Sequence, residues 1–195
     1  MKKIIILAFV LLSIIAKAQE VEKVSVEKNL YGAYFGLLSS GFQYETRLDR
    51  KTTLMSEVGL TLVTSTKESN NPEIKDKTTT IFAPYVSLEP RWYYGLDRRS
   101  KFLRNTKNNS SNYISLKTSF ISSKTPIIKN GDFDVVSAIM IMPKYGIRRS
   151  FSKNFYYEFS GGYGYQYNIF SKTSGCNCKH SSADIDIQAR IGYNF

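Results

Sequence analysis

Residues 183–195 have the sequence ADIDIQARIGYNF, in which apolar or aromatic residues alternate with polar residues and glycine. A helix would scatter Ile185, Ile187 and Ile191 over different faces, whereas a strand places all three on one face. The segment is also long enough for a tilted membrane-spanning strand, which needs about 10 residues. The sequence therefore predicts a β-strand here, with one apolar and one polar face.

The same period of two recurs along the rest of the chain. It is weakest in the first predicted strand, where Tyr31, Ala33 and Phe35 would face outward. Pro84 and Pro90 fall inside one strand, where a proline cannot donate to the ladder, and bulges on the outward face would have to accommodate them. The eight predicted strands cover approximately residues 28–37, 42–48, 54–62, 82–94, 114–120, 139–148, 155–168 and 183–195.

The connections between these strands alternate in length. Residues 49–52 and 150–153 form tight turns. The longer polar loops are residues 64–78, 122–134 and 169–181. Outer-membrane barrels have short periplasmic turns and longer external loops, and strand parity makes residues 95–111 the exception, a long connection on the periplasmic side. This pattern predicts an all-β fold, an eight-stranded antiparallel up-and-down transmembrane β-barrel.

The first 18 residues have the features of a secretory signal peptide. A lysine pair precedes the apolar run 4–15, and Ala16-Lys17-Ala18 has the small-x-small pattern of a signal-peptidase site. The run is too short for a membrane-spanning helix, which needs about 20 residues. Cleavage would leave residues 19–195 as a single barrel domain and would lower the formal charge from +11 to +8, because the leader holds three lysines and no acid.

The charges on the polar face distinguish a membrane barrel from a soluble one. A soluble lipocalin-like barrel would be apolar inside and polar outside, and the alternation alone does not say which face is which. Six acids and six bases lie on the polar face. Such a balance suits an enclosed lumen, because an unpaired buried charge has a large desolvation cost, and an eight-stranded barrel is just wide enough for side chains to fill it. The predicted lumen salt-bridge network consists of Glu45, Arg47, Glu57, Glu89, Arg91, Lys117, Lys144, Arg148, Glu158, Asp184, Asp186 and Arg190.

Two further motifs favour the membrane interpretation. Residues 161–165 have the glycine–aromatic sequence GGYGY, and residues 191–195 have the sequence IGYNF. Together with the export signal, these features resemble the small eight-stranded outer-membrane proteins of the OmpA, OmpX and OmpW kind, and the barrels common in Bacteroidetes-type genomes. The resemblance implies a Gram-negative outer-membrane location. It also implies that Ile191, Tyr193 and Phe195 form an assembly signal for the barrel-insertion machinery.

The segment between Cys176 and His180 carries the most reactive side chains. In an extended chain, Cys176, Cys178 and His180 would project to one side, and thiols and imidazole are ligands for zinc or copper. A fourth metal ligand is missing. A Cys176–Cys178 disulfide is favoured by export but closes a small, strained ring, and free or partner-linked thiols are the third alternative. We therefore predict no cofactor, and this segment stays a weak metal candidate.

A cluster of basic residues occupies the long connection 95–111. Nucleic acid is the usual partner of a basic protein, but export argues against it. Anionic lipid headgroups are an alternative, since a basic residue near such a surface gains roughly 1 kcal/mol, and a solvated turn is the simplest interpretation. Apolar residues inside the basic run suggest docking of another envelope protein. The predicted periplasmic docking turn consists of Arg98, Arg99, Lys101, Phe102, Leu103 and Arg104.

The sequence thus predicts a non-enzymatic envelope barrel, either structural or a docking point for envelope proteins. Its expected partners are outer-membrane lipids, the insertion machinery and other envelope proteins. A small pore, or a lateral conduit for hydrophobic molecules, is the alternative from the transport class. An outer-rim lipid-modifying enzyme is the third candidate, but catalysis by His180 would need a third group to hold it, and the sequence places none there.

Overall fold

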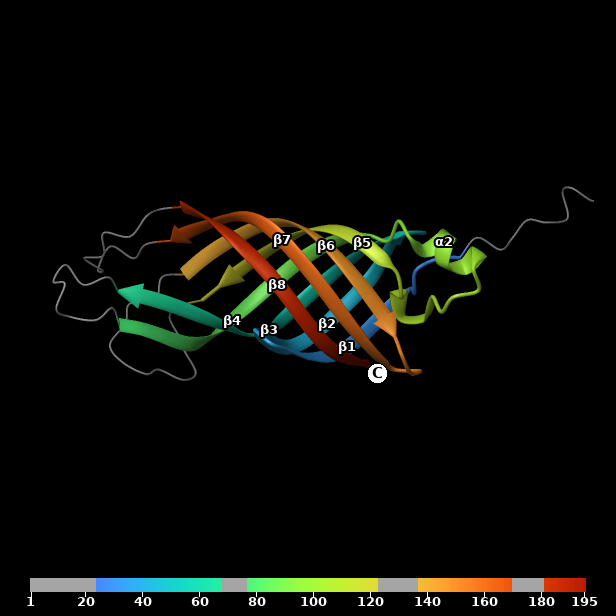
Figure 1. Cartoon of the computed structure of the whole chain (residues 1–195), viewed down its shortest axis with the longest axis horizontal. Helices are drawn as coiled ribbons and strands as arrows, with labels where there is room; N and C mark the ends of the chain where they lie inside the picture. Colours follow the sequence, from blue (N-terminus) through green and yellow to red (C-terminus); the bar gives the residue numbers. More distant parts are fainter. Residues whose placement is uncertain (1–23, 68–76, 123–136, 170–180) are drawn as a thin grey trace, which may run out of the picture.

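The computed structural model describes residues 24–67, 77–122, 137–169 and 181–195, and in these ranges the chain is an antiparallel β-barrel (Figure 1). Each strand pairs with its neighbour in sequence, and the last strand pairs with the first, so the sheet closes. The eight-stranded, up-and-down fold predicted from the period of two is confirmed. The strands are β1 (Asn29–Gly36), β2 (Ser39–Asp49), β3 (Thr52–Lys67), β4 (Lys77–Trp92), β5 (Asn112–Ile121), β6 (Ser137–Ser150), β7 (Phe155–Ile169) and β8 (Ser181–Asn194).

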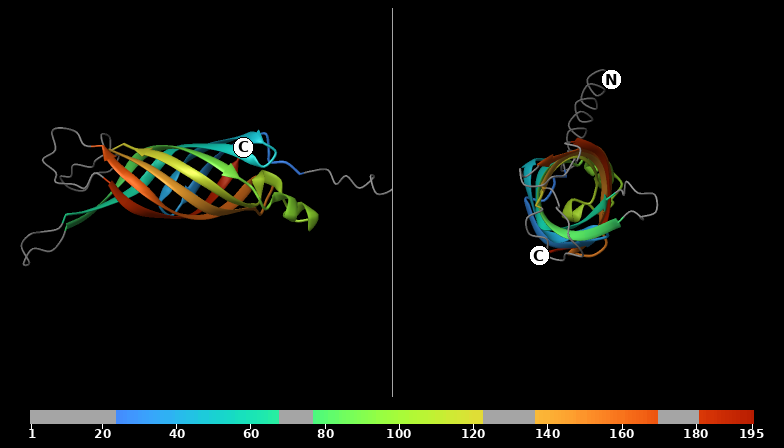
Figure 2. Two further views of the ribbon diagram at one scale, coloured as in Figure 1. Left: turned by 90° about the horizontal axis from the view of Figure 1, so that it is seen from above. Right: turned by 90° about the vertical axis from the view of Figure 1, so that its left-hand side faces the viewer.

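The two faces of each strand separate as the alternation predicts. In β8, Ile187 is 70% exposed on the outside of the barrel, whereas Arg190 is buried inside. In β4, Trp92 is 49% exposed while Glu89 and Arg91 are buried. Successive side chains of a strand point to opposite faces of a sheet. Because the sheet closes into a ring (Figure 2), the exposed apolar residues lie on its outside and the buried charged residues in its interior.

The prolines in the strands point outward, and Pro90 and Pro143 each interrupt one ladder. The bulges expected at Pro84 and Pro90 do not form, because the register is the same on both sides of each. The β3–β4 ladder runs without a break past Pro84 and Pro90. The β4–β5 ladder lacks pairs between Leu88 and Arg91, at Pro90, and the β6–β7 ladder lacks pairs between Ile141 and Lys144, at Pro143. Proline has no N–H to donate, which accounts for the local loss of pairing while the strand continues.

One end of the barrel carries a cap. The connection between β4 and β5 contains a short helix, α2 (Leu96–Lys101), and a single 3-10 turn, η1 (Lys107–Asn109). It lies at the same end as the tight turns that follow β2 and β6, where the sequence placed it, and we call this the α2 end (Figure 1). No helix within the described ranges is long and apolar enough to cross a membrane.

Candidate functional site

The interior of the barrel near the α2 end holds a network of ion pairs centred on Glu158 of β7. Its two carboxylate oxygens accept hydrogen bonds from three guanidinium groups and one phenol. Arg148 donates from Nε at 2.8 Å, and Arg91 donates from both terminal nitrogens at 3.0 and 3.2 Å. Arg190 donates at 2.6 Å and the Tyr113 hydroxyl at 2.9 Å. Glu158 therefore links β4, β5, β6 and β8 through the centre of the lumen.

Three further glutamates extend this network along the barrel axis. Glu45 accepts hydrogen bonds from Arg148 at 2.6 Å and from Tyr93 at 2.8 Å. Glu57 accepts from Arg190 and from Lys117, the latter at 2.9 Å. Glu89 is held by Arg91 at 2.9 Å and by Ser115 at 2.6 Å. Each carboxylate thus has at least one cationic donor.

Tyrosine rings line the arginines of the network. The Arg148 guanidinium lies 4.2 Å from the centre of the Tyr156 ring, Arg91 lies 4.4 Å from Tyr113, and Arg190 lies 4.7 Å from Tyr34. An aromatic face attracts a cation, most strongly when both are desolvated. These rings therefore pack directly on the guanidiniums of the network.

Glycines opposite two of these tyrosines make room for the rings. Tyr113 pairs across the sheet with Gly146, and Tyr156 pairs with Gly192. A Cβ atom at Gly146 would overlap the Tyr113 ring, and one at Gly192 would overlap the Tyr156 ring. Each of these glycines is therefore needed to make space for the inward-pointing tyrosine ring opposite it.

The structure buries nine of the twelve charged residues that the sequence assigned to the lumen. They comprise four acids, Glu45, Glu57, Glu89 and Glu158, and five bases, Arg91, Lys117, Lys144, Arg148 and Arg190. Asp186 is only partly buried, but it accepts a 2.6 Å hydrogen bond from Lys144, which balances the fifth base. Transfer of a charge from water is costly unless it is paired, and here every buried charge has an opposite partner.

Two of the twelve residues lie outside this network, which corrects the prediction. Arg47 is exposed near the end of β2, at the last pair before the β2–β3 register shifts toward Asp49. Asp184 is partly exposed toward the opposite end, and its carboxylate accepts from the N–H of Ile185. Both have the parity of lumen residues, but they lie beyond the length of barrel that the network fills.

A small apolar cluster closes the α2 end beneath the network. Val26, Leu96, Tyr93 and Tyr113 are fully buried against one another. Outside this cluster, Asp97 of α2 binds the β2–β3 turn, with 2.7 Å to Arg50 and 2.5 Å to Lys51. The hydrogen bonds from these two residues lower the pKa of Asp97 to about 2. Seen along the barrel axis, the cap segment lies across the opening of the ring (Figure 2).

The opposite half of the lumen is open. A cavity of about 320 Å³ lies among residues of seven of the eight strands, β2 to β8, with Lys117 and Tyr85 at its inner limit. Its wall mixes polar side chains such as Gln166 and Gln188 with Met140 and Met142. Few of the described charged residues line this cavity, whereas the half of the lumen near the α2 end contains the ion-pair network. The two halves therefore differ in charge and in packing.

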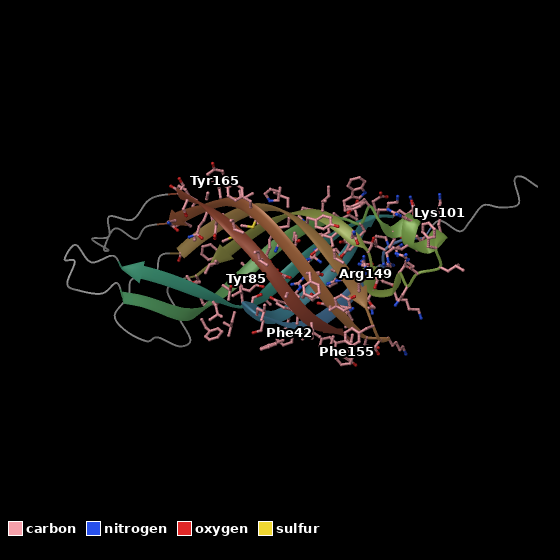
Figure 3. All side chains as sticks on the ribbon, in the orientation of Figure 1. Phe42, Tyr85, Lys101, Arg149, Phe155 and Tyr165 are labelled. Atoms are coloured by element: carbon pink, nitrogen blue, oxygen red, sulfur yellow. The ribbon has the colours of Figure 1, made fainter. Side chains whose placement is uncertain are left out.

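The outer surface of the cap carries the predicted docking turn. Phe102 and Leu103 are 64% and 96% exposed at its tip, and Leu103 has a positive φ of 51°. Arg98, Lys101 and Arg104 are also exposed around this tip, and the Arg104 guanidinium lies 5.9 Å from the Phe102 ring. Figure 3 shows Lys101 at the outer side of the cap and Arg149 on the barrel wall beside it.

The remaining predicted site residues fall on the outer face or outside the described ranges. Ile191, Tyr193 and Phe195 point outward at the α2 end of β8 and just beyond it, and their role in assembly stays a prediction. Cys176, Cys178 and His180 lie outside the residues that the structure describes, as does the proposed signal peptide.

The sequence interpretation missed the inward tyrosines. It assigned aromatic residues to the outward face, whereas Tyr34, Tyr85, Tyr93, Tyr113 and Tyr156 are buried. Their parity would have revealed them, since each shares the polar face of its strand with buried charged or polar residues. Tyr85, for example, is two residues from Ser87 and four from Glu89, and its hydroxyl donates to Glu57 at 3.3 Å.

No family model and no curated protein sequence matches the chain. Its function must therefore be inferred from the fold and from the contacts of the described residues.

Proposed function

We propose that this chain is a non-enzymatic outer-membrane barrel with a closed lumen, which serves the envelope as a structural protein and as a docking point at its α2 end. The observation that carries the proposal is the neutralised ion-pair network inside a barrel whose outer face is apolar. The export signal and the resemblance to small outer-membrane barrels support the same location.

The outer face supports a lipid environment. Large apolar side chains are exposed on every strand, among them Phe42, Tyr165 and Phe155, which point away from the barrel in Figure 3. Soluble monomers rarely expose contiguous apolar patches of more than a few hundred Å², whereas a membrane barrel carries an apolar band with aromatic girdles. Tyr31 stacks on Tyr44, and Phe155 packs edge-on against Tyr193, near the α2 end.

The interior supports a closed barrel over a pore or a conduit. The Glu158 network links opposite walls, and the cluster around Leu96 lies between it and the α2 end. Planar-bilayer recording tests this point with purified protein. We expect no steady conductance for the native chain. Steady ion conductance from the native barrel would contradict the closed-lumen proposal and would favour the small pore.

The exposed tip of the cap supports docking. Phe102 and Leu103 have no apolar cover within the described residues, and basic side chains surround them. We expect envelope proteins to co-purify with the native chain in mild detergent and to be lost from the double variant Phe102→Ser and Leu103→Ser. A matched control is Phe151→Ser, because Phe151 is also exposed at this end but packs on Phe155 and Tyr157. An unchanged set of partners in the double variant would contradict docking at this tip.

Localisation is tested separately by cell fractionation. We expect the full chain in the outer-membrane fraction, resistant to extraction by urea or alkaline carbonate. A freely water-soluble mature protein would overturn the proposed function as a whole.

A further inference from the structure

An apolar hollow opens on the outer wall of the barrel, across β4 to β7. Its volume is about 740 Å³, and its outward-facing lining includes Trp92, Ile114, Pro143, Tyr145 and Tyr163 around Gly161. Tyr145 pairs across the sheet with Gly161, whose missing side chain leaves the backbone as the floor of the hollow. A Cβ atom at Gly161 would have only the Asp186 carbonyl oxygen nearby, at 3.8 Å.

A chain of hydrogen bonds leads from this hollow to a fixed arginine nearer the α2 end. The Tyr145 hydroxyl accepts a 2.8 Å hydrogen bond from Asn112, and the Asn112 amide oxygen accepts a 2.5 Å hydrogen bond from Arg149. Arg149 also donates to the carbonyl of Arg148 at 2.7 Å. Four residues separate Tyr145 from Arg149, about 13 Å along an extended strand.

A second arginine is fixed beside Arg149. Arg99 of α2 donates to the Asn105 carbonyl oxygen at 3.2 and 2.9 Å. The Asn105 side chain in turn donates to the carbonyl of Ser150, the residue after Arg149, at 3.2 Å. Partial burial and the nearby Arg149 and Arg104 guanidiniums lower the pKa of Arg99. The hydrogen bonds therefore hold like charges together.

These guanidiniums have no carboxylate partner in the described ranges. The acid closest to them in α2, Asp97, is already bound by Arg50 and Lys51, and no ion pair of Arg99, Arg104 or Arg149 occurs among the described residues. A planar guanidinium matches the oxygens of a phosphate group. The surface thus offers a place for an anion on the same wall as the apolar hollow, nearer the α2 end.

We propose that Arg149, Arg99 and the hollow over Gly161 form a binding site for one anionic glycerophospholipid. The phosphate accepts hydrogen bonds from the two guanidiniums, and an acyl chain lies in the hollow between Trp92, Pro143 and Tyr163. Tyr145 and Asn112 lie between the two parts, at the level of the glycerol and ester groups. The inference depends on the proposed function, because it requires the outer face to be in a bilayer with the α2 end at one leaflet surface.

A second hollow on the same wall provides an internal comparison. It has a volume of about 380 Å³ and lies farther from the α2 end, with Val86, Leu88, Thr118, Phe120 and Ile139 on its outward side. No basic residue lines it. An acyl chain of bulk lipid would fill this hollow, but nothing in it selects a headgroup.

Trp92 provides a direct readout, because it is the only tryptophan of the chain and it lines the first hollow. The purified full chain is reconstituted in phosphatidylcholine vesicles with an increasing fraction of phosphatidylglycerol that carries brominated acyl chains, which quench tryptophan fluorescence on contact. If lipids mixed at random, quenching of Trp92 would simply follow the fraction of brominated lipid. We expect stronger quenching than this, with a preference for the anionic lipid of about 25-fold, because each of the two arginines near the anionic group contributes roughly a factor of five.

Three variants separate the parts of the site. The double variant Arg99→Gln and Arg149→Gln should bring the preference for brominated phosphatidylglycerol close to one. Gly161→Phe fills the hollow without a backbone clash and should reduce quenching at every lipid fraction. Thr118→Phe fills the second hollow and should leave both the preference and the quenching unchanged.

The outcomes also distinguish this inference from the proposed function. Native protein that resists urea extraction from the vesicles but shows random quenching overturns the lipid site and leaves the membrane barrel intact. If the double variant Arg99→Gln and Arg149→Gln keeps the preference for phosphatidylglycerol, these two arginines do not bind the phosphate. If Gly161→Phe leaves the quenching of Trp92 and the lipid preference unchanged, no acyl chain lies in the hollow over Gly161. Failure of the native chain to enter vesicles contradicts the proposed function itself.

Discussion

The barrel has two groups of basic residues that differ in how their charge is compensated. Inside the lumen, Arg91, Arg148 and Arg190 converge on one carboxylate, Glu158. On the cap and the adjoining wall, Arg99 and Arg149 are held by backbone carbonyls and an asparagine, without a described acid.

The inner arginines have acidic partners and the outer ones have none among the described residues, because the inner group is buried and the outer group is solvated. A buried charge without a partner is strongly destabilising, so the interior must carry as many acids as bases. A charge at a surface is solvated and screened, and a surface ion pair contributes little to stability. The inner arginines are therefore part of the fold, whereas the outer arginines can be left for a partner that arrives from outside. Removal of an inner charge should destabilise the barrel, and removal of Arg99 or Arg149 should change only what the barrel binds.

The substitution Glu158→Gln should destabilise the barrel more than any other single change in the network. It removes the one negative charge that three guanidiniums share, and loss of one partner from a buried ion pair costs about 3–5 kcal/mol. Urea unfolding of vesicle-reconstituted protein, followed by Trp92 fluorescence, measures the change in the free energy of unfolding. Glu27→Gln is the matched control, since Glu27 is exposed, and its midpoint should not move. Equal midpoints for both variants would show that the network does not stabilise the barrel.

Substitution of two glycines tests whether packing inside the barrel is tighter than packing on its outer wall. Gly146→Ala places a methyl group where the Tyr113 ring lies, and overpacking of this kind costs typically about 1–3 kcal/mol. Gly161→Ala adds the same methyl group over an open hollow and should change stability by less than about 0.5 kcal/mol. The comparison uses the same urea titration, and a larger loss for Gly161→Ala than for Gly146→Ala would contradict the packing described for the interior.

The fold could be predicted because the alternation of apolar and polar residues within a strand can be recognised without knowing which strands pair or in what register. Every strand that shows the alternation in sequence exists in the structure, and Ile187 and Trp92 lie on the face expected for them. The six acids and six bases counted on the polar face also indicated that the charges in the lumen would balance. These features depend only on which face a side chain takes, which a strand sets locally.

The partners within the lumen were not predictable in the same way. Glu158 meets Arg91 of β4 across a separation of 67 residues, which depends on barrel closure and on the stagger of the strands. Arg47 had the right parity but lies near the end of β2, just before a register shift, and the length of barrel that the network fills has no signature in the alternation. The packing of Leu96 on Val26 could not be predicted from the sequence, because only the closed barrel brings these two residues together.

The smallest of the predicted effects concerns the clamp between Asp97 and the β2–β3 turn. Because Arg50 and Lys51 lower the pKa of Asp97 in the folded state from its usual 3.8 to about 2, the clamp is fully present above about pH 4 and is lost as the pH falls toward 2. The effect should be small, since solvent screens partly exposed pairs. Asp97→Asn should therefore be slightly less stable than the native chain at pH 5, and the difference between their urea midpoints should vanish near pH 2. Other carboxylates titrate in the same range, but they contribute equally to both proteins and cancel in this difference. A difference that stays constant from pH 5 to pH 2 would show that the ionised form of Asp97 does not hold the cap, and the positions of Arg50 and Lys51 would then need another cause.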